Sequence, residues 1–475
     1  MNLCASSTYK FFFAGVFFIL ATGLFSQNNT KRFTVDSITI RGNEKTHAKI
    51  ILRELSFKQG EAFTREELEQ KCLRSQHNIM NTSLFVFDTL YLRIDTVTEK
   101  ANVLISVKER WYFWPSLILQ IQDRNFNAWW YQEHRDISRL NYGVGFTLYN
   151  IFGLNQTLTC IVRRGYTEQY GAGYRIPYIN KKQTLGLVAS YYYYQNNQIW
   201  YNTNKTELQY FTDKENYVRK EQEAKIGLSH RHKLYLRQSI ELFYKTSAVT
   251  DTIVRLNDNY FEKGTGQTAI QYLSLQYRFT YDKRDYKPYP LKGTAIDGYI
   301  GKDGFGVLKN ETPDNLFFIA SIKNSFKICN RLYMMNSIKG RYAAMYKPMY
   351  YFNRALGFSD IVRGYEYNVI DGQHFVLAKT NLRFQVIKPR VVRIPVNAFH
   401  QFMSVSYALY VGPFADVGYV SDNYFTKFNT LSNQWLSGAG LGIDLVSYYD
   451  YVLRTEFTMN NLGQPGIFLH LNAPL

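Results

Sequence analysis

The chain of 475 residues carries a formal net charge of +18 at pH 7, and 17% of its residues are aromatic. Only 20% of the residues are charged and only 11 are prolines, which excludes a mainly disordered chain. After residue 26 no apolar run approaches the ~20 residues of a membrane-spanning helix, which excludes a helical membrane protein. Lysines and arginines are scattered along the chain, a pattern that favours a wet channel or anionic headgroups over nucleic acid as their partner.

The first 26 residues are typical of a secretory signal peptide. Lys10 precedes an apolar run from Phe11 to Phe25, and Ser26 ends it. A basic start, an apolar core and a small residue at the exit indicate export. A transmembrane anchor is the alternative, and the run is short for one. The three later cysteines are far apart and have neither disulfide nor metal-ligand spacing: Cys72, Cys160 and Cys329.

Residues 33–111 are predicted to form a small α/β domain. The domain begins with an alternating strand, and Thr64 and Glu67 have the spacing of a capping box at the start of a helix. Two strands follow this helix. The predicted order is β-α-α-β-β, with elements near 33–40, 47–55, 64–81, 84–94 and 103–107.

The strings "ITIRGNEKT", "ILRELSFKQGEAF" and "NTSLFVFDTL" resemble a POTRA domain over this whole module. An unrelated small α/β domain is the alternative. The resemblance implies a periplasmic module that feeds unfolded chains to an outer-membrane barrel, with its second strand at a sheet edge. An exposed edge offers unpaired N–H and C=O groups to an incoming strand. The hypothesis is therefore a client-capture edge at Phe87, Leu90 and Leu92.

From residue 112 to 475 the apolar residues recur with a period of two. For example, Leu275 and Tyr277 alternate with Gln276 and Arg278. A soluble sandwich also alternates. However, the predicted strands of about 9 to 14 residues are long enough to cross a bilayer when tilted. Aromatics also crowd strand ends, as at Tyr191–Tyr194 and Tyr448–Tyr449.

We therefore predict a mainly β fold: a transmembrane antiparallel β-barrel of 16 strands, preceded by the small periplasmic domain. An even strand count places both barrel ends on the periplasmic side. Three long outer loops are expected at 196–215, 246–266 and 345–373, and the twelfth strand at 374–387.

Three further strings resemble the outer-membrane protein assembly-factor superfamily, the BamA-like or bacterial surface antigen barrels. They are "YDKRDYKPYPLKGT", "GFSDIVRGYEYNVIDGQHF" and "GPFADVGYVSD". The resemblance implies that the long loop enters the barrel and that its arginine pairs with an aspartate on the inner wall. The matching loop positions are Val362, Arg363, Gly364 and Tyr365, and the wall positions are Phe414, Asp416 and Gly418. The first string is interpreted as a structural turn built on Asp282, Arg284, Asp285, Pro290 and Gly293.

Periodicity independently supports half of this pairing. Leu409 and Val411 share one face of their strand, so Asp416 faces the lumen. A buried carboxylate requires a partner, and a guanidinium can donate two parallel hydrogen bonds to it. The alternative is that Arg363 is an ordinary solvated loop charge.

The resemblance implies insertion or assembly of client proteins in the outer membrane of a Gram-negative bacterium. The expected seam lies between the first strand, about 114–122, and the last, 466–471. The expected partners are unfolded outer-membrane proteins, the lipid bilayer and accessory lipoproteins, but no nucleic acid. One POTRA module and a final Leu475 leave a dedicated role, or lipid as cargo, equally open.

The main alternative function is a passive pore or surface receptor. No HExxH, GxSxG, P-loop or CxxC motif occurs, so no enzyme activity, cofactor or catalytic residue is expected. His230 and His232 share one face of a predicted strand and are interpreted as polar wall residues rather than a metal site.

Overall fold

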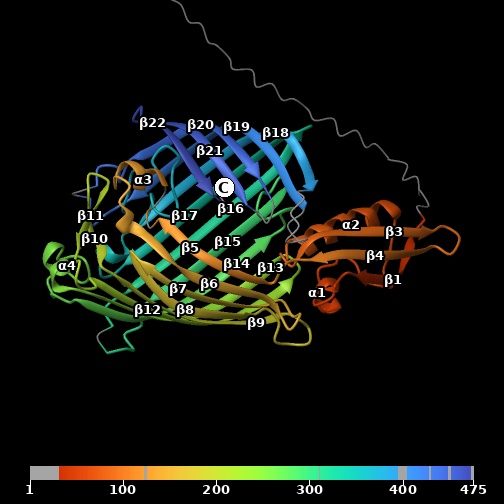
Figure 1. The fold of residues 1–475 in the computed structure, drawn as a ribbon, viewed down its shortest axis with the longest axis horizontal. Helices are drawn as coiled ribbons and strands as arrows, with labels where there is room; N and C mark the ends of the chain where they lie inside the picture. The colour runs from red at the N-terminus through yellow and green to blue at the C-terminus, as the bar shows by residue number, and fades with distance from the viewer. Residues whose placement is uncertain are drawn as a thin grey trace, which may run out of the picture.

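The computed structural model describes residues 31–121, 123, 126–309, 311–393, 404–426, 429–447 and 451–471. The expected signal peptide, Tyr448–Tyr449 and Leu475 lie outside these residues. Among the described residues, no helix is both long and apolar enough to span a bilayer. A small α/β domain lies against one end of a large barrel, as Figure 1 shows.

The small domain confirms the expected POTRA-like layout, with one short strand added. Its sheet has the order β2-β1-β4-β3, in which β1 and β4 are parallel. Thr64 and Glu67 form the expected capping box at the start of α2. The helices cover one face of the sheet with apolar side chains such as Ile50, Leu68 and Ile79. The elements are β1 (Phe33–Arg41), α1 (Ala48–Leu52), β2 (Ala62–Phe63), α2 (Arg65–Met80), β3 (Phe85–Asp95) and β4 (Lys100–Glu109).

Strand β3 lies at the edge of this sheet, as the resemblance to POTRA domains implied. Leu90 and Leu92 are half-buried and pack against the core of the domain. Their side chains therefore do not project toward a partner, and the edge offers its backbone instead. Tyr91 alternates with them and is 58% exposed.

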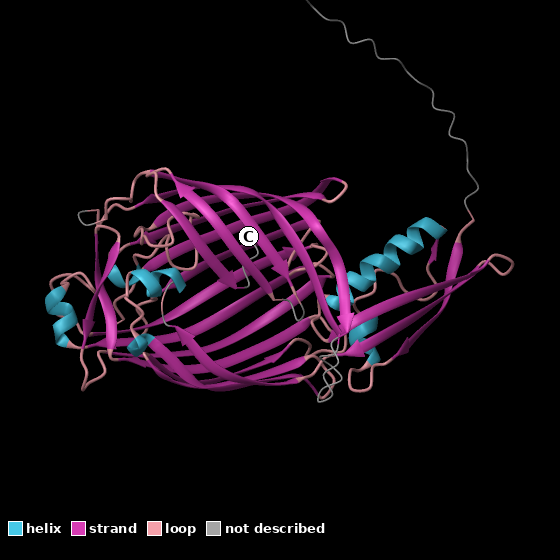
Figure 2. Ribbon diagram, turned by 45° about the horizontal axis from the view of Figure 1, so that its top comes forward, coloured by secondary structure: helices cyan, strands magenta, loops and turns pink. Residues whose placement is uncertain are grey.

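The remaining chain confirms the predicted barrel: one antiparallel sheet of 16 strands, each paired with its neighbour in the chain order of barrel strands. Figure 2 shows these strands curling around a common axis, with short helices at the end far from the α/β domain. The barrel strands are β5 (Phe113–Ile121), β6 (Leu140–Ile151), β7 (Gln156–Gly165), β8 (Thr167–Ile176), β9 (Leu185–Asn196), β12 (Arg219–Lys233), β13 (Leu236–Val249), β14 (Ala269–Asp282), β15 (Gly293–Asp303), β16 (Asn315–Cys329), β17 (Leu332–Met345), β18 (His374–Arg393), β19 (Ser404–Ser421), β20 (Trp435–Val446), β21 (Val452–Asn460) and β22 (Pro465–Leu471).

The outer loops contain more structure than the sequence indicated. The loop at 196–215 contains a hairpin of β10 (Gln198–Asn204) and β11 (Glu207–Thr212). Its turn uses Lys205 and Thr206 at positive φ, without the glycine or asparagine that announces such a turn. The other short elements are α3 (Phe126–Tyr131), η1 (Ile137–Arg139), α4 (Asp251–Leu256) and η2 (Tyr350–Phe352). Strand β18 also continues six residues past its predicted end at 387.

The two faces of the barrel wall differ as the alternation predicts. Ile226 and Ile240 face outward and are more than half exposed. Charged pairs face the lumen, with Lys245 3.0 Å from Glu223. The Tyr191–Tyr194 run alternates across the sheet, because Tyr192 is paired in register with the lumen-facing Glu223. Only half of this run can therefore contribute to an outer aromatic girdle.

The α/β domain docks on the short turns at one end of the barrel. Arg231, at the β12–β13 turn, donates two hydrogen bonds of 2.7 Å to Glu54. Asn81, which follows the last residue of α2, donates to the backbone oxygen of Asp285 at 3.0 Å. Thr46 accepts from Asn150 at 2.8 Å. The short turns therefore lie on the same side as this domain, and the long loops lie at the other end.

Candidate functional site

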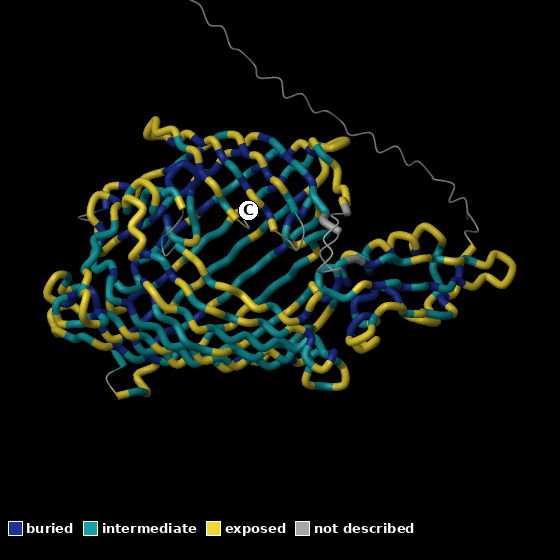
Figure 3. The backbone as a smooth tube through the Cα atoms, viewed as in Figure 1, coloured by how far each residue is buried: buried dark blue, intermediate teal, exposed yellow. Residues whose placement is uncertain are grey.

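Residues 346–373, here called the inserted loop, fold back against the inner wall of the barrel. Val362, Tyr365 and Ile370 are at most 1% exposed. They pack with wall residues of β18 to β20, among them Leu377 and Leu436. Figure 3 shows the buried residues gathered along the strands at the top of the view, where β18 to β22 lie. The loop therefore fills part of the lumen.

Arg363 of the inserted loop and Asp416 of β19 are brought together in the lumen. The backbone N–H of Arg363 donates to Oδ2 of Asp416 at 3.1 Å, and its Nε donates to the same oxygen at 2.8 Å. A second guanidinium nitrogen donates to Oδ1. Nη1 donates to Asn381 at 2.6 Å and to Glu456 at 3.3 Å. The guanidinium thus binds Asp416 in a fork, which a lysine could not reproduce.

Burial makes this pair energetically important. The side chain of Arg363 is 5% exposed and that of Asp416 is fully buried. The guanidinium carbon also lies 3.8 Å from the centre of the Phe414 ring, within the range of a cation–π contact. Removing one partner of such a buried pair leaves an uncompensated charge. The contacts therefore fix the inserted loop to β19.

The neighbouring motif residues allow this close approach. Gly364 has φ of +94°, which L side chains rarely adopt, and its carbonyl accepts from Asn460 at 2.8 Å. A Cβ added at Gly418 would lie 2.5 Å from a methyl group of Val362. The Tyr365 hydroxyl donates to Asn461. The loop segment 362–365 and the wall segment 414–418 are therefore held together by close backbone packing as well as by the charged pair.

A second buried charge network adjoins the first and was not predicted. Arg383 donates to Asp444 at 2.8 Å, and Arg454 donates to the same carboxylate at 2.7 Å. The Tyr289 hydroxyl donates to it at 2.6 Å. Asn381 accepts from both Arg363 and Arg383 and so joins the networks. Strand alternation could have identified Arg383 and Arg454 as lumen-facing, but Tyr289 comes from a turn and carries no such signal.

The turn string is held together by its own polar contacts. Arg284 donates to both oxygens of Asp282, at 2.9 and 2.8 Å. Oδ1 of Asp285 accepts from the backbone N–H of Leu291 at 3.1 Å. Pro290 lies in this turn, and Gly293 starts β15 at φ of +108°. The turn also contacts the docked domain through Asp285 and carries Tyr289 to the lumen network.

The first and last barrel strands form a seam. Among the described residues no ladder joins β5 to β22, so both strands are sheet edges. Leu117 and Leu119 of β5 are 90% and 79% exposed. Asn127 of α3 donates to the backbone oxygen of Ile467 in β22 at 2.6 Å. The edge of the seven-residue β22 is therefore contacted by a short helix.

Comparison with known proteins agrees with this geometry. Residues 33–110 match the POTRA family model, described as surface antigen variable number repeat. The crystal structure of BamA from Haemophilus ducreyi lacking POTRA domains 1-3 is similar at 13% identity and a TM-score of 0.50, over 92% of this chain and 84% of its own. CdiB from Escherichia coli is similar at 12% identity and a TM-score of 0.53, over 93% of this chain and 75% of its own. A search of the curated proteins found no match.

The fold is that of a BamA-like barrel preceded by a POTRA domain. Antiparallel barrels with an apolar outer face occur in bacterial outer membranes. This BamA-like chain is therefore an outer-membrane barrel, and its POTRA domain and short turns face the periplasm.

Proposed function

We propose that the protein assists the insertion or assembly of client proteins in the outer membrane. The observation that carries the proposal is the seam between β5 and β22, which has no ladder among the described residues. A sheet edge within a bilayer leaves backbone groups without partners, which is costly in hydrocarbon. A client strand that pairs with this edge removes that cost.

The POTRA domain supplies the capture step. Strand β3 is an edge strand, and it pairs on its other side only with β4. An extended client segment adds to such an edge through main-chain hydrogen bonds. Unfolded outer-membrane proteins are the proposed clients, because their strands are unpaired before insertion. The side chains of Leu90 and Leu92 pack inward, so capture depends on the backbone of β3 rather than on these leucines.

The seam supplies the release step. A client strand pairs with the edge of β5 or β22 and leaves sideways into lipid. The driving force is the completion of client hydrogen bonds together with burial of its apolar face in the bilayer. No catalytic chemistry or cofactor enters this mechanism. Accessory lipoproteins would act by delivering clients to the POTRA domain.

The test is depletion of the protein, followed by measuring folded outer-membrane barrels by heat modifiability in gels. We expect folded barrels to fall while their unfolded precursors accumulate. Unchanged levels of every barrel, together with altered permeability to small solutes, would instead support a passive pore. A matched control restores the depleted strain with the wild-type chain.

A further inference from the structure

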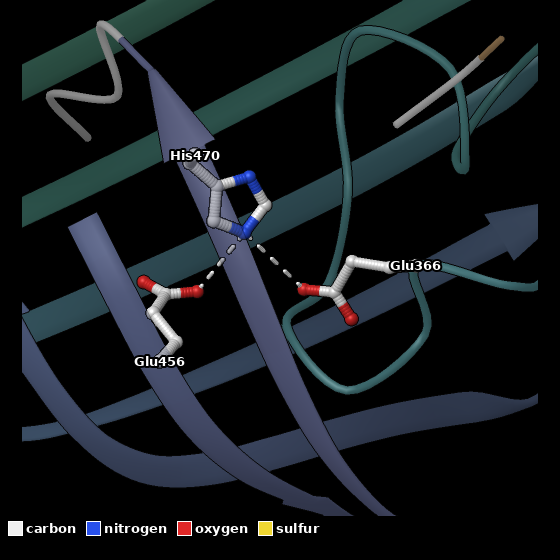
Figure 4. Close-up of side chains that lie close together, drawn as sticks. All are labelled: Glu366, Glu456 and His470. Atoms are coloured by element: carbon white, nitrogen blue, oxygen red, sulfur yellow. Dashed lines mark ion pairs between the residues drawn. The ribbon is translucent and has the colours of Figure 1, made fainter. Parts of the chain in front are cut away.

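Three side chains of types that can ligate a metal ion meet where the inserted loop contacts the last two strands. They are Glu366 of the loop, Glu456 of β21 and His470 of β22 (Figure 4). Nε2 of His470 lies 3.3 Å from Oε2 of Glu456 and 3.9 Å from Oε1 of Glu366. One ligand atom from each residue lies within 4.8 Å of the other two. The three groups come from distant parts of the sequence and converge on one point.

Each carboxylate uses one oxygen locally and turns the other toward the histidine. Oε1 of Glu456 accepts from Arg363 at 3.3 Å, and Oε2 of Glu366 accepts from the N–H of Gly364 at 2.8 Å. Glu456 is 1% exposed, and its Oε2 forms no hydrogen bond of good geometry among the described residues. The same holds for Nε2 of His470. A buried carboxylate oxygen without such a bond is costly unless a further group satisfies it.

We propose that Glu366, Glu456 and His470 bind one divalent transition metal ion of the zinc class. Zinc takes imidazole nitrogen and carboxylate oxygen at about 2.0–2.2 Å. Four tetrahedral ligands at that length lie roughly 3.3 Å apart, close to the spacing between His470 and Glu456. Glu366 then needs only a small side-chain adjustment. The imidazole disfavours calcium and magnesium, which prefer all-oxygen sites.

The surroundings leave room for a fourth metal ligand and hold two of the three side chains, Glu366 and Glu456, in a fixed orientation. All three residues line a cavity of about 560 Å³ in the lumen, so a water molecule can complete the coordination. The contacts to Arg363 and Gly364 fix the two carboxylates, as hydrogen bonds behind metal ligands commonly do. Arg363 and Arg454 are each also paired with another carboxylate, Asp416 or Asp444. Their charges are therefore shared and do not neutralise Glu456 alone.

A bound ion would connect the inserted loop to the last two strands, of which β22 forms one edge of the seam. Because His470 lies on β22, the ion would hold this edge strand against β21 and the loop. This consequence rests on the proposed function, whereas the binding itself does not. The metal would then hold β22 in its place at the seam and oppose its displacement by a client strand.

The test is metal titration of the full chain, without an affinity tag, purified in detergent micelles and stripped with a chelator. Cobalt is the spectroscopic probe and zinc the competitor. We expect one cobalt ion per chain with tetrahedral absorption, displaced by zinc. His470→Gln and Glu366→Gln should each weaken binding at least tenfold while keeping the heat-modifiable folded form. The matched control is His230→Gln with His232→Gln, which removes two neighbouring wall histidines and should leave the site intact.

Two results would overturn the site. One is a wild-type chain that binds no ion saturably, which would mean that the three side chains contact one another without a metal. The other is binding lost only in the His230 and His232 variant. The seam effect has its own readout, because zinc should slow amide exchange over residues 465–471 in the wild type but not in His470→Gln. Binding without this slowing would contradict the seam effect while leaving the site in place.

Discussion

Replacing Arg363 tests whether the forked pair holds the inserted loop. Arg363→Ala removes the forked partner of Asp416 and leaves it with Lys379, whose Nζ lies 3.7 Å away, as its remaining cationic partner. Breaking such a buried pair costs up to about 3–5 kcal/mol. Arg363→Lys keeps the charge but loses the fork to Asp416 and the bond to Asn381. Hydrogen bonds to charged groups contribute about 1.5–3 kcal/mol each, so losing one bond of the fork and the bond to Asn381 should cost the lysine variant about 3 kcal/mol or more. Lysine should therefore rescue little.

The assay is urea unfolding in lipid vesicles, followed by heat modifiability, with protease digestion of the loop in the folded state. The matched control is Arg390→Lys, an exposed position on the same strand as Asn381. A double-mutant cycle with Asp416→Asn isolates the coupling between the two side chains. Wild-type stability and an intact loop in Arg363→Lys would refute the reasoning. Growth of a depleted strain on each variant then reports whether loop packing matters for assembly.

Other predictions concern the POTRA domain. Burial raises the pKa of the Asp88 carboxyl from its ordinary 3.8 to about 7, so the stability that this carboxyl contributes is fully present below pH ~4 and is lost as the pH rises through 7. After correction for intrinsic rates, Asp88→Asn should therefore slow amide exchange of residues 85–109 much more at pH 8 than at pH 4. Equal effects at both would contradict this. Tyr91→Pro should abolish client cross-linking to β3, while Tyr91→Ala should retain it. Glu54→Ala should release the domain from the barrel, seen as faster protease cleavage between them, whereas Lys58→Ala, on an exposed POTRA residue, should not.

Alternation and strand length predicted the fold because they reflect a single physical constraint. A wall with lipid on one side and water on the other requires a period of two, and crossing the bilayer requires long strands. The sequence did not predict the hairpin β10–β11, because its strands pair only with each other and its turn contains no glycine. The sequence did not predict that β18 continues past residue 387, because Lys388 and Pro389 interrupt the apolar pattern.

The same distinction holds for the candidate site: periodicity could place residues on strands but not residues in turns and loops. Periodicity placed Asp416 in the lumen, and the resemblance supplied Arg363 as its partner. Neither could indicate that Tyr289 reaches Asp444, because a turn residue has no period. Glu366, Glu456 and His470 were missed for a similar reason. Their spacing in the chain matches no metal motif, and only the path of the inserted loop brings them together.

The inserted loop also constrains the order in which this chain can complete its own fold. Arg363 bonds to Asn381, Asp416 and Glu456, which follow it by 18, 53 and 93 residues. Tyr289 bonds to Asp444 across 155 residues. Contacts so distant along the chain are slow to form, because the chain loses the entropy of loop closure before it gains the energy of the contact. These interior contacts can therefore be completed only after the strands near the C-terminal end of the chain have been added to the wall, so the loop is fixed in the lumen late in the folding of the barrel itself.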